Sequence, residues 1–335
     1  GAPAGHGACG GSSAKDRLAK FREKVNKKYG PGTVVSMSQD CIEADIETFS
    51  TGALTVDLAL GGGLPYGRIV EIYGPEQSGK TTLALHCIAS VQKSGRHCAF
   101  IDAECAMDRD YAVSLGVDPE LWELMNPDSA EKATELAIDA AESGCFGLII
   151  IDSVAALSPE EELEKGMDEM TIGLLARIMS KFMRKITAVL SRTNTTLLLI
   201  NQLRANIGGY GPSELTTGGS AVRYYSTVRM MIRAPRSGLL GRAESPYGIR
   251  SKVTVTKNKL AAPHRVGEFD LLFGRGISWE SSVIEAAVGK KIIDVKGAWL
   301  EYDGHKEHGK ERFRQTLQEN PDLLEKLERA CRVAR

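Results

Sequence analysis

Residues 48–274 alternate between short runs of consecutive apolar residues and longer stretches in which apolar residues recur every three or four positions. The short runs are typical of strands buried on both faces, and the longer stretches are typical of amphipathic helices. Residues 172–190 are one such helical stretch. The alternation predicts an α/β domain with a mainly parallel sheet. The predicted buried strands are residues 68–73, 98–102, 148–152 and 197–201.

The pattern changes on either side of these elements. Residues 225–233 and 250–256 read as a later pair of strands, which we expect to be antiparallel. Beyond Trp279 we expect a compact tail of about two helices and a few short strands. The division that follows is a disordered leader (1–13), an N-terminal helix with its linker (14–43), an α/β core (44–278) and a C-terminal domain (279–335).

Residues 14–29 predict a helix with a single apolar face, ended by the Gly-Pro-Gly of residues 30–32. One short helix cannot bury such a face alone, so it must pack against something else. Its partner is either the rest of the same chain or a neighbouring subunit.

Composition limits the classes of protein. The chain has 335 residues, 42% of them hydrophobic and 25% charged, with a formal net charge of −1. Whole-molecule attraction to nucleic acid is therefore not implied, and DNA binding would need a local patch. The seven cysteines never have C-x-x-C spacing, which fits free thiols in the cytoplasm. The apolar runs are too short to span a membrane.

A phosphate-binding motif follows the first predicted strand. It matches G-x-x-x-x-G-K-[ST] and lies between a strand and a helix, where such loops occur. Backbone N–H groups and the helix N-terminus would bind phosphate oxygens. Lys80 would reach the β- and γ-phosphates of ATP, and the Thr81 hydroxyl would bind Mg²⁺. The expected nucleotide-binding residues are Gly74, Pro75, Glu76, Gln77, Ser78, Gly79, Lys80, Thr81 and Thr82.

Two carboxylate positions complete this chemistry. Asp152 ends a buried strand, where it could hold the Mg²⁺ shell together with Thr81. Glu104 follows the strand at 98–102 and could orient or deprotonate the attacking water. Asp102 is the competing candidate, and spacing alone does not separate the two.

The chain resembles the bacterial RecA family over nearly its whole length from about Lys15. The strings that carry the resemblance are 71–76 (EIYGPE), 100–104 (FIDAE), 152–157 (DSVAAL), 200–204 (INQLR), 216–219 (TTGG) and 257–263 (KNKLAAP). The resemblance implies a RecA-type P-loop ATPase core with an N-terminal polymerisation helix and a small α+β C-terminal domain.

The resemblance also implies roles for single residues. Glu104 would be the catalytic carboxylate, and Asp108 and Tyr111 would hold the adenine. Gln202 would end its strand near the γ-phosphate and report the nucleotide state to the second DNA-binding loop. Phe273 stands where the family usually has a tyrosine near the nucleotide.

Lys257 and Lys259 would reach the γ-phosphate of the neighbouring subunit, as an arginine finger does in other NTPases. At i and i+2 they would share one face of a strand, which suits a single anionic target. The alternative for this pair is a solvated sheet edge.

Two segments would bind DNA according to the resemblance. The first, around residues 166–173, leads into a predicted helix, and the second runs from 203 to about 220. Ile172 and Ile207 would enter between bases as apolar wedges, unless they are buried within the protein. The full set is Ile172, Arg177, Ser180, Arg184, Arg204, Ile207, Thr217, Gly218, Gly219 and Ser220.

The expected function is therefore ATP-dependent homologous recombination. Filaments on single-stranded DNA would search double-stranded DNA by base pairing and exchange strands, with ATP and Mg²⁺ as cofactors. Repressors as cleavage targets are a further partner that the resemblance leaves open, and no membrane partner is expected. The rivals are a ring-forming helicase of the same superfamily and a non-catalytic ATP-gated scaffold. In the C-terminal domain, Lys290, Lys291 and Lys296 form either a capture patch for duplex DNA or an ordinary mixed surface.

Overall fold

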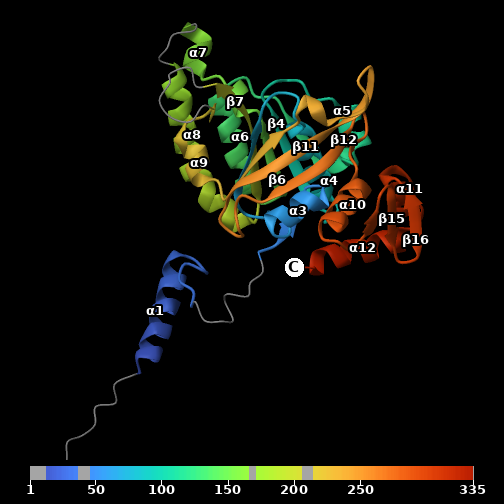
Figure 1. Cartoon of the computed structure of the whole chain (residues 1–335). Coiled ribbons are helices and arrows are strands. Elements are labelled where there is room, and N and C mark those ends of the chain that lie inside the picture. The colour runs from blue at the N-terminus through green and yellow to red at the C-terminus, as the bar shows by residue number, and fades with distance from the viewer. Residues whose placement is uncertain (1–12, 37–45, 166–170, 206–213, 335) are drawn as a thin grey trace, which may run out of the picture. The chain divides into compact units, whose positions relative to one another are not determined.

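The computed structural model describes residues 13–36, 46–165, 171–205 and 214–334 (Figure 1). The chain divides into two compact units, with the boundary between Ile46 and Glu47. Each unit is considered by itself below. In the part of the chain that is described, no helix is long and apolar enough to cross a membrane.

The first unit contains helix α1 (Ala14–Tyr29), which has the predicted bounds. Ser13 and Asp16 form a capping box, because the Ser13 hydroxyl accepts from the Asp16 N–H and the Asp16 carboxylate accepts from the Ser13 N–H. Gly30 ends the helix with a φ of 107°, which glycine adopts at no steric cost.

The second unit is built on one large sheet. Its strands are β3 (Ile69–Gly74), β4 (His97–Asp102), β5 (Trp122–Met125), β6 (Phe146–Asp152), β7 (Thr196–Ala205), β8 (Glu214–Thr216), β9 (Val228–Arg233), β10 (Leu239–Arg242), β11 (Ser245–Asn258), β12 (Val266–Leu272) and β13 (Gly276–Ile277). The main path runs β13-β12-β11-β9-β3-β7-β6-β4-β5, with β10 on β11 and β8 on β7. A separate small sheet pairs β1 (Thr48–Phe49) with β2 (Leu64–Pro65).

The sheet has a parallel half and an antiparallel half. Strands β9, β3, β7, β6, β4 and β5 are parallel, as predicted for the core. Strands β9, β11, β12 and β13 are antiparallel, which confirms the expected later pair. That pair begins at Val228 rather than 225, because residues Ser220–Tyr225 form helix α9.

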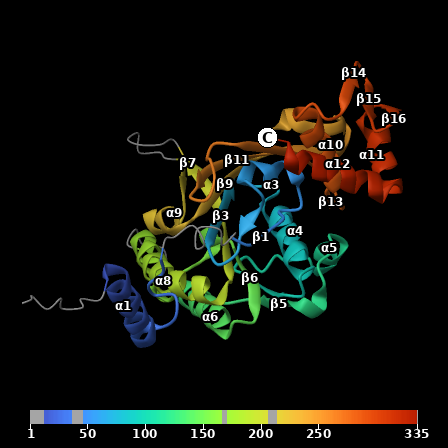
Figure 2. The same cartoon turned by 90° about the horizontal axis from the view of Figure 1, so that it is seen from below.

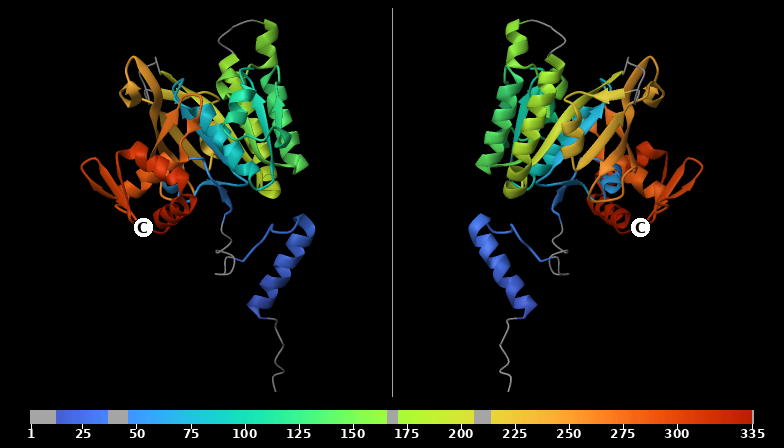
Figure 3. Two further views of the ribbon diagram at one scale, coloured as in Figure 1. Left: turned by 90° about the vertical axis from the view of Figure 1, so that its right-hand side faces the viewer. Right: turned by 90° about the vertical axis from the view of Figure 1, so that its left-hand side faces the viewer.

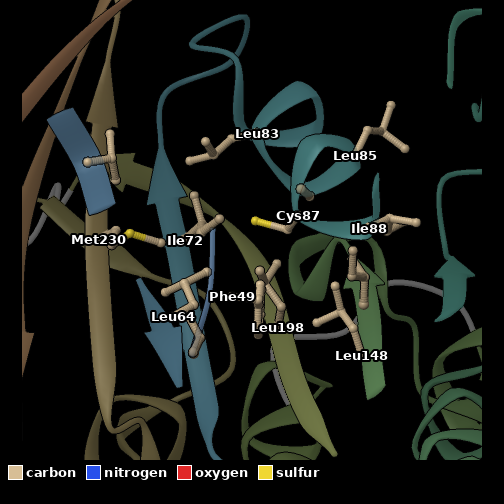
Figure 4. Close-up of a cluster of buried hydrophobic side chains, with 14 of the residues drawn as sticks. Phe49, Leu64, Ile72, Leu83, Leu85, Cys87, Ile88, Leu148, Leu198 and Met230 are labelled. Carbon is tan, nitrogen blue, oxygen red and sulfur yellow. The ribbon is translucent and has the colours of Figure 1, made fainter. Parts of the chain in front are cut away.

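Helices cover both faces of the parallel half. They are α4 (Lys80–Gln92) and α5 (Arg109–Ser114) on one face, and α6 (Ala130–Ser143), α8 (Thr171–Thr193) and α9 on the other. Helix α3 (Leu54–Leu60) packs instead on the antiparallel strands β11 and β12. The remaining elements are α7 (Glu160–Lys165) and short 3-10 turns at Pro119–Leu121, Val154–Ala156 and Arg236–Gly238. Along β6, Leu148 and Ile150 join the core under α4, whereas Ile149 and Ile151 join the core under α6 and α8. The two-residue alternation of a strand thus builds two hydrophobic layers. Figure 2 shows α6 and α8 side by side, and Figure 4 shows strand residues facing α4.

The C-terminal domain follows β13 and contains α10 (Trp279–Gly289), β14 (Asp294–Lys296), β15 (Trp299–Tyr302), β16 (His305–His308), α11 (Lys310–Glu319) and α12 (Pro321–Val333). It therefore has three helices within the described residues, where the sequence had indicated about two. The domain has its own core around Phe313 and Leu327, and Leu54 of α3 packs into it. The Ser282 hydroxyl of α10 accepts from the Leu54 N–H of α3 at 2.9 Å. Figure 3 shows the C-terminal domain beside the antiparallel half of the sheet, where α10 packs on β12.

Candidate nucleotide and DNA site

The phosphate loop connects β3 to α4 at the carboxyl edge of the sheet. Gln77 and Gly79 have φ values of 56° and 95°, and these left-handed residues turn the loop before the helix. A Cβ on Gly74 would lie 2.1 Å from the Ile232 carbonyl oxygen of β9. Only glycine fits at that crossing of two backbones, so the sequence motif has a direct steric reason here.

Lys80 is buried at the first position of α4. Its Nζ donates to the Gly74 carbonyl at 3.1 Å and to the Pro75 carbonyl at 2.6 Å. Burial lowers the pKa of this ammonium, while Asp152, Glu104 and Glu76 act in the opposite direction. The cation is thus held against the loop by groups of its own chain.

Three carboxylates meet beside the loop, because β4 and β6 are paired with Asp102 opposite Asp152. The Thr81 hydroxyl donates to Asp152 at 2.7 Å. Burial raises the pKa of Asp152 to about 6; the Thr81 hydrogen bond opposes this shift, and the nearby Glu104 and Asp102 add to it. The Thr81 hydroxyl and one Asp152 carboxylate oxygen therefore lie side by side, where both could bind one ion.

The alternatives Asp102 and Glu104 differ in their surroundings. Asp102 is 4% exposed, and its two oxygens accept backbone N–H groups from Glu104 and Met107. Glu104 is exposed and accepts a 2.8 Å hydrogen bond from the Ser153 hydroxyl. Asp102 is thus occupied in shaping the turn, and Glu104 is the carboxylate that can face a bound molecule.

The expected adenine residues lie at the start of α5. Asp108 is its N-cap and accepts from the Tyr111 N–H at 3.0 Å. The Tyr111 hydroxyl lies 3.1 Å from the Thr82 hydroxyl of α4, so this helix is tied to the phosphate loop. Phe273 is 51% exposed just beyond β12.

Gln202 does not end its strand, contrary to the sequence interpretation. Strand β7 continues to Ala205 because it exchanges partners: Gln202 is the last residue paired with β3, opposite Gly74, and Leu203 is paired with Thr216 of β8. The antiparallel β7–β8 pair therefore extends the strand beyond the sheet edge. Gln202 lies next to the phosphate loop, at the junction of the two pairings.

The expectation that Lys257 and Lys259 share a strand face was also wrong. The register of β11 shifts between Val255 and Lys257, and the strand ends at Asn258, so Lys259 lies in the following turn. Such a bulge re-aims side chains. The Lys257 Nζ donates to the Arg223 and Tyr224 carbonyls at the end of α9, at 2.8 and 3.0 Å.

In the first expected DNA segment, residues 166–170 and the side chain of Ile172 lie outside the described residues. Arg177 and Arg184 are exposed on α8, and Ser180 is half-buried between them. Their spacing of three and four places them on one helix face, opposite the face that packs on the sheet.

In the second segment, Ile207 and the side chain of Arg204 lie outside the described residues. Gly218 is buried, and a Cβ there would lie 3.0 Å from Val154, two residues after Asp152. Gly219 caps the exposed start of α9 at Ser220. The Thr217 hydroxyl is buried and without a hydrogen-bond partner among the described residues.

Sequence reasoning missed a set of buried polar residues beneath this site: Glu71, Asn201 and Arg229. The sequence feature that could have revealed them is a polar residue among the apolar residues of each of the strands β3, β7 and β9. Asp102, Glu104 and Asp152 lie near one another, but no three His, Cys, Asp or Glu side chains within the described ranges are placed to hold one metal ion together.

Comparison with known proteins identifies the family of the chain. The model of the RecA N-terminal domain matches residues 16–278, and that of the RecA C-terminal domain matches residues 281–334. Among curated proteins, the chain is 48% identical to Protein RecA of Sulfurovum sp. (strain NBC37-1), over 93% of this chain and 90% of that protein. It is 45% identical to Protein RecA of Arthrospira platensis, over 96% and 88% respectively.

The Protein RecA of Azoarcus sp. (strain BH72) is 46% identical, over 94% of this chain and 92% of that protein. These relatives match nearly end to end, as do the two domain models together. A nucleotide-binding loop, carboxylates beside it and a separate C-terminal domain are all present in the described part of the chain. The chain thus belongs to the RecA family of ATP-dependent recombinases, which bind DNA and assemble with copies of themselves.

Proposed function

We propose that this chain recombines DNA as a helical filament on single-stranded DNA, with ATP between neighbouring subunits. The observation that carries the proposal is the packing of Gly218, in the second DNA segment, against Val154, directly beyond the carboxylate cluster at Asp152. A shift at the nucleotide would reach the DNA segment through this contact. Such coupling of the nucleotide to the DNA segment is what ATP-dependent strand exchange requires.

In hydrolysis, Glu104 is the carboxylate that orients and deprotonates water. Its exposure beside the half-buried pair of Thr81 and Asp152 supports this role, as does the occupation of Asp102 by backbone N–H groups. The hydrogen bond from Ser153 holds Glu104 towards the loop. Lys80 would exchange the Gly74 and Pro75 carbonyls for the β- and γ-phosphate oxygens.

Thr81 and Asp152 fit Mg²⁺, because a hydroxyl and a carboxylate oxygen are ligands that this ion prefers. When bound, the ion neutralises charge on the phosphates. The adenine would lie against Tyr111, with Asp108 at the start of the same helix and Phe273 near it.

Lys257 and Lys259 would contact the γ-phosphate of the next subunit. Burial lowers the pKa of Lys257, and the neighbouring Lys259 and Arg229 lower it further, with Glu71 in opposition. A cluster of cations is relieved by an incoming anion, which supports this assignment. Lys257 would leave the Arg223 and Tyr224 carbonyls to make the contact.

Self-assembly would use α1, whose apolar residues Leu18, Phe21 and Tyr29 are each more than half exposed. Single-stranded DNA would meet Arg177, Ser180 and Arg184 of α8 together with the 217–220 segment and Arg204. Ile172 and Ile207 would act as the wedges between bases. Duplex DNA is the proposed second ligand, and repressors remain a proposed class of target.

The test is ATP-dependent exchange between a circular single strand and a homologous linear duplex, with a heterologous duplex as control. Electron microscopy on single-stranded DNA with a non-hydrolysable ATP analogue accompanies it. Helical filaments and homology-dependent products are expected. Six-fold rings that unwind duplex would favour a helicase, and ATP binding without turnover would favour a scaffold.

A further inference from the structure

Three polar side chains lie in the centre of the sheet, on adjacent strands β9, β3 and β7. Glu71 and Asn201 are fully buried, and Arg229 is 8% exposed. The Glu71 carboxylate accepts from the Arg229 Nε at 2.5 Å and from the Asn201 Nδ2 at 3.1 Å. A buried ion pair adds little net stability compared with apolar residues of the same volume, so stability is a weak reason for placing one here.

The orientation of the Asn201 amide follows from its partners. Its Nδ2 faces two groups that only accept, the Glu71 carboxylate and, at 2.7 Å, the Thr217 carbonyl. Its Oδ1 accepts from the Gln202 N–H at 2.9 Å. An amide is the side-chain group that can donate to two acceptors and accept from one donor at the same time.

These contacts connect the phosphate loop to the second DNA segment in a few steps. Lys80 donates to the Gly74 carbonyl, and Gly74 is paired with Gln202 across β3 and β7. Asn201 then holds the Gln202 N–H with one end of its amide and the Thr217 carbonyl with the other. Thr217 immediately precedes the two glycines that start α9. The path crosses the point where β7 changes partner.

We propose that Asn201 is a positioning residue, which transmits the state of the phosphate loop to the second DNA segment. Glu71, held by Arg229, fixes the amide so that a shift at Gly74 is passed to Thr217 through Gln202 and Asn201. We call the Asn201 side chain, with its hydrogen bonds to the Gln202 N–H and the Thr217 carbonyl, the strut. Because both of these partners are backbone groups, the coupling needs no contact between Asn201 and either ligand. The inference rests on the proposed function in one respect, namely that the 217–220 segment contacts DNA.

The test exchanges the two polar partners. In Glu71→Gln/Asn201→Asp the net charge and side-chain sizes are kept, and the amide now at position 71 can donate to the carboxylate at position 201. That carboxylate cannot donate to the Thr217 carbonyl, so this hydrogen bond is removed selectively. We expect affinity for a fluorescent ATP analogue to stay within about twofold of wild type. The gain in single-strand affinity that the nucleotide produces should fall at least about tenfold, which a coupling loss of 1.4 kcal/mol or more would give.

Two controls isolate the hydrogen bond to Thr217. Glu71→Gln alone leaves an acceptor for Asn201 and should keep most of the nucleotide-dependent gain in DNA affinity. Tyr73, like Glu71, lies on β3; Tyr73→Phe removes its 2.9 Å, part-buried hydrogen bond to Thr256 of β11 and tests the effect of losing another polar interaction of this strand. An unchanged gain in the exchanged variant would overturn the proposal. Loss of nucleotide affinity in parallel with DNA affinity would also overturn it, because it would place Asn201 in the nucleotide site.

Hydrogen exchange of the wild-type chain keeps the proposal testable if the exchanged variant does not fold. Adding the ATP analogue without DNA should change the exchange of amides at 216–220 together with those at 74–81 and 202. An unchanged 216–220 segment would contradict the strut. Adding single-stranded DNA tests the underlying assumption separately: if DNA leaves 203–220 unprotected while the nucleotide alone changes it, the strut stands and the proposed binding of DNA to this segment fails.

Discussion

The two halves of the proposed ATP site are built in different ways. The half made by the phosphate loop is held by hydrogen bonds of its own chain, from Lys80 to the Gly74 and Pro75 carbonyls and from Thr81 to Asp152. The half proposed to act on a neighbour has Lys257 engaged with the carbonyls at the end of α9. In the first half, the groups expected to act on ATP already contact one another within the chain. In the second half, Lys257 contacts helix α9 of its own chain, whereas its proposed target is a phosphate bound to a neighbour.

This difference separates what a local motif specifies from what an assembly must supply. Gly74 is required by the close approach of the loop to β9, and Gly79 by the left-handed turn before α4. The loop sequence alone therefore specifies this turn, without a neighbouring subunit. Lys257 stands after a bulge in a long strand, and its proposed target belongs to another subunit. Binding of that target competes with contacts that the isolated chain already makes. In the ATP-bound filament, the carbonyls at the end of α9 would therefore lose their hydrogen bonds from Lys257.

The strongest test of the first half is Lys80→Ala. It removes the cation expected at the β- and γ-phosphates, and we expect ATP hydrolysis to fall by about 10³-fold or more, with strand exchange abolished. Steady-state phosphate release measures this, with circular dichroism as the control for folding. Near-normal turnover would exclude the loop from the mechanism.

Glu104→Gln should separate binding from hydrolysis. The amide keeps the shape and an oxygen that accepts the Ser153 hydroxyl, yet it is too weak a base to activate water. Turnover should fall by about 10²-fold while nucleotide and DNA binding persist. Asp102→Asn is the matched variant: it should chiefly reduce stability, because its oxygens hold backbone N–H groups. If it reduced turnover more than Glu104→Gln, the assignment of the two carboxylates would be reversed.

The same contrast explains how much of the site the sequence could predict. Lys80, Thr81 and Asp152 were predicted because a motif and the end of a buried strand each act locally. Glu104 and Asp102 could not be separated, since the choice depends on which oxygens accept the N–H groups of the following turn.

Longer-range features were missed or misjudged for a physical reason. The bulge before Lys257 arises from pairing with β9, and the extension of β7 past Gln202 arises from pairing with β8. The apolar pattern of a single strand does not show which strand it pairs with, so neither feature could be predicted from it. The core helices and parallel strands were predicted well, because burial on both faces imposes continuous apolar runs.

Helix α4 provides a test of how firmly the first half is fixed. Its His86 accepts a 2.9 Å hydrogen bond from the Ile277 N–H, and burial, with a smaller effect of Lys93, lowers the histidine pKa to about 4. The unfolded pKa is about 6.5, so below that pH the unfolded chain binds the extra proton first. Stability is therefore full above pH 6.5 and falls as the pH drops towards 4.

We expect the free energy of unfolding to fall by about 2 kcal/mol from pH 7 to pH 5 because of this histidine. His86→Gln keeps an acceptor for the Ile277 N–H and removes the titration. Denaturant unfolding of both proteins at each pH, compared as a difference, cancels the buried carboxylates, whose raised pKa values act in the opposite direction. Equal acid sensitivity in the two proteins would mean that His86 is accessible to protons in the folded chain.

The second half is tested by mixing two inactive variants, Lys257→Ala/Lys259→Ala and Lys80→Ala. In a head-to-tail assembly at equal amounts, about one interface in four joins an intact loop to intact lysines. ATPase should therefore recover to roughly a quarter of the wild-type rate per site. Co-sedimentation on DNA confirms that both variants share filaments. Inactivity at every ratio, with co-assembly shown, would place the lysines outside the site.

The C-terminal lysines differ in how free they are. The Lys290 ammonium donates to the Ala334 carbonyl, and Lys296 forms a 3.0 Å ion pair with Asp294. Lys291 is exposed directly after α10. A lysine already paired gains less from a phosphate than an unpaired one, so the contribution of each residue to duplex capture should differ.

The smallest expected effect is on duplex capture by preformed filaments. Replacing Lys290, Lys291 and Lys296 with Ala should weaken duplex binding by releasing fewer counterions, and the log–log salt slope should become shallower by about 0.9 for each phosphate that the variant no longer neutralises. Because Lys296 and Lys290 are engaged within the domain, Lys291→Ala alone should account for most of the change. Lys326→Ala, which breaks the exposed pair with Asp303 in the same domain, is the matched control and should leave the slope unchanged. ATPase and single-strand binding should be normal in all of these variants. If the triple variant keeps the wild-type slope and affinity, the three lysines are ordinary solvated surface, and capture of the duplex must depend on the DNA segments of the core.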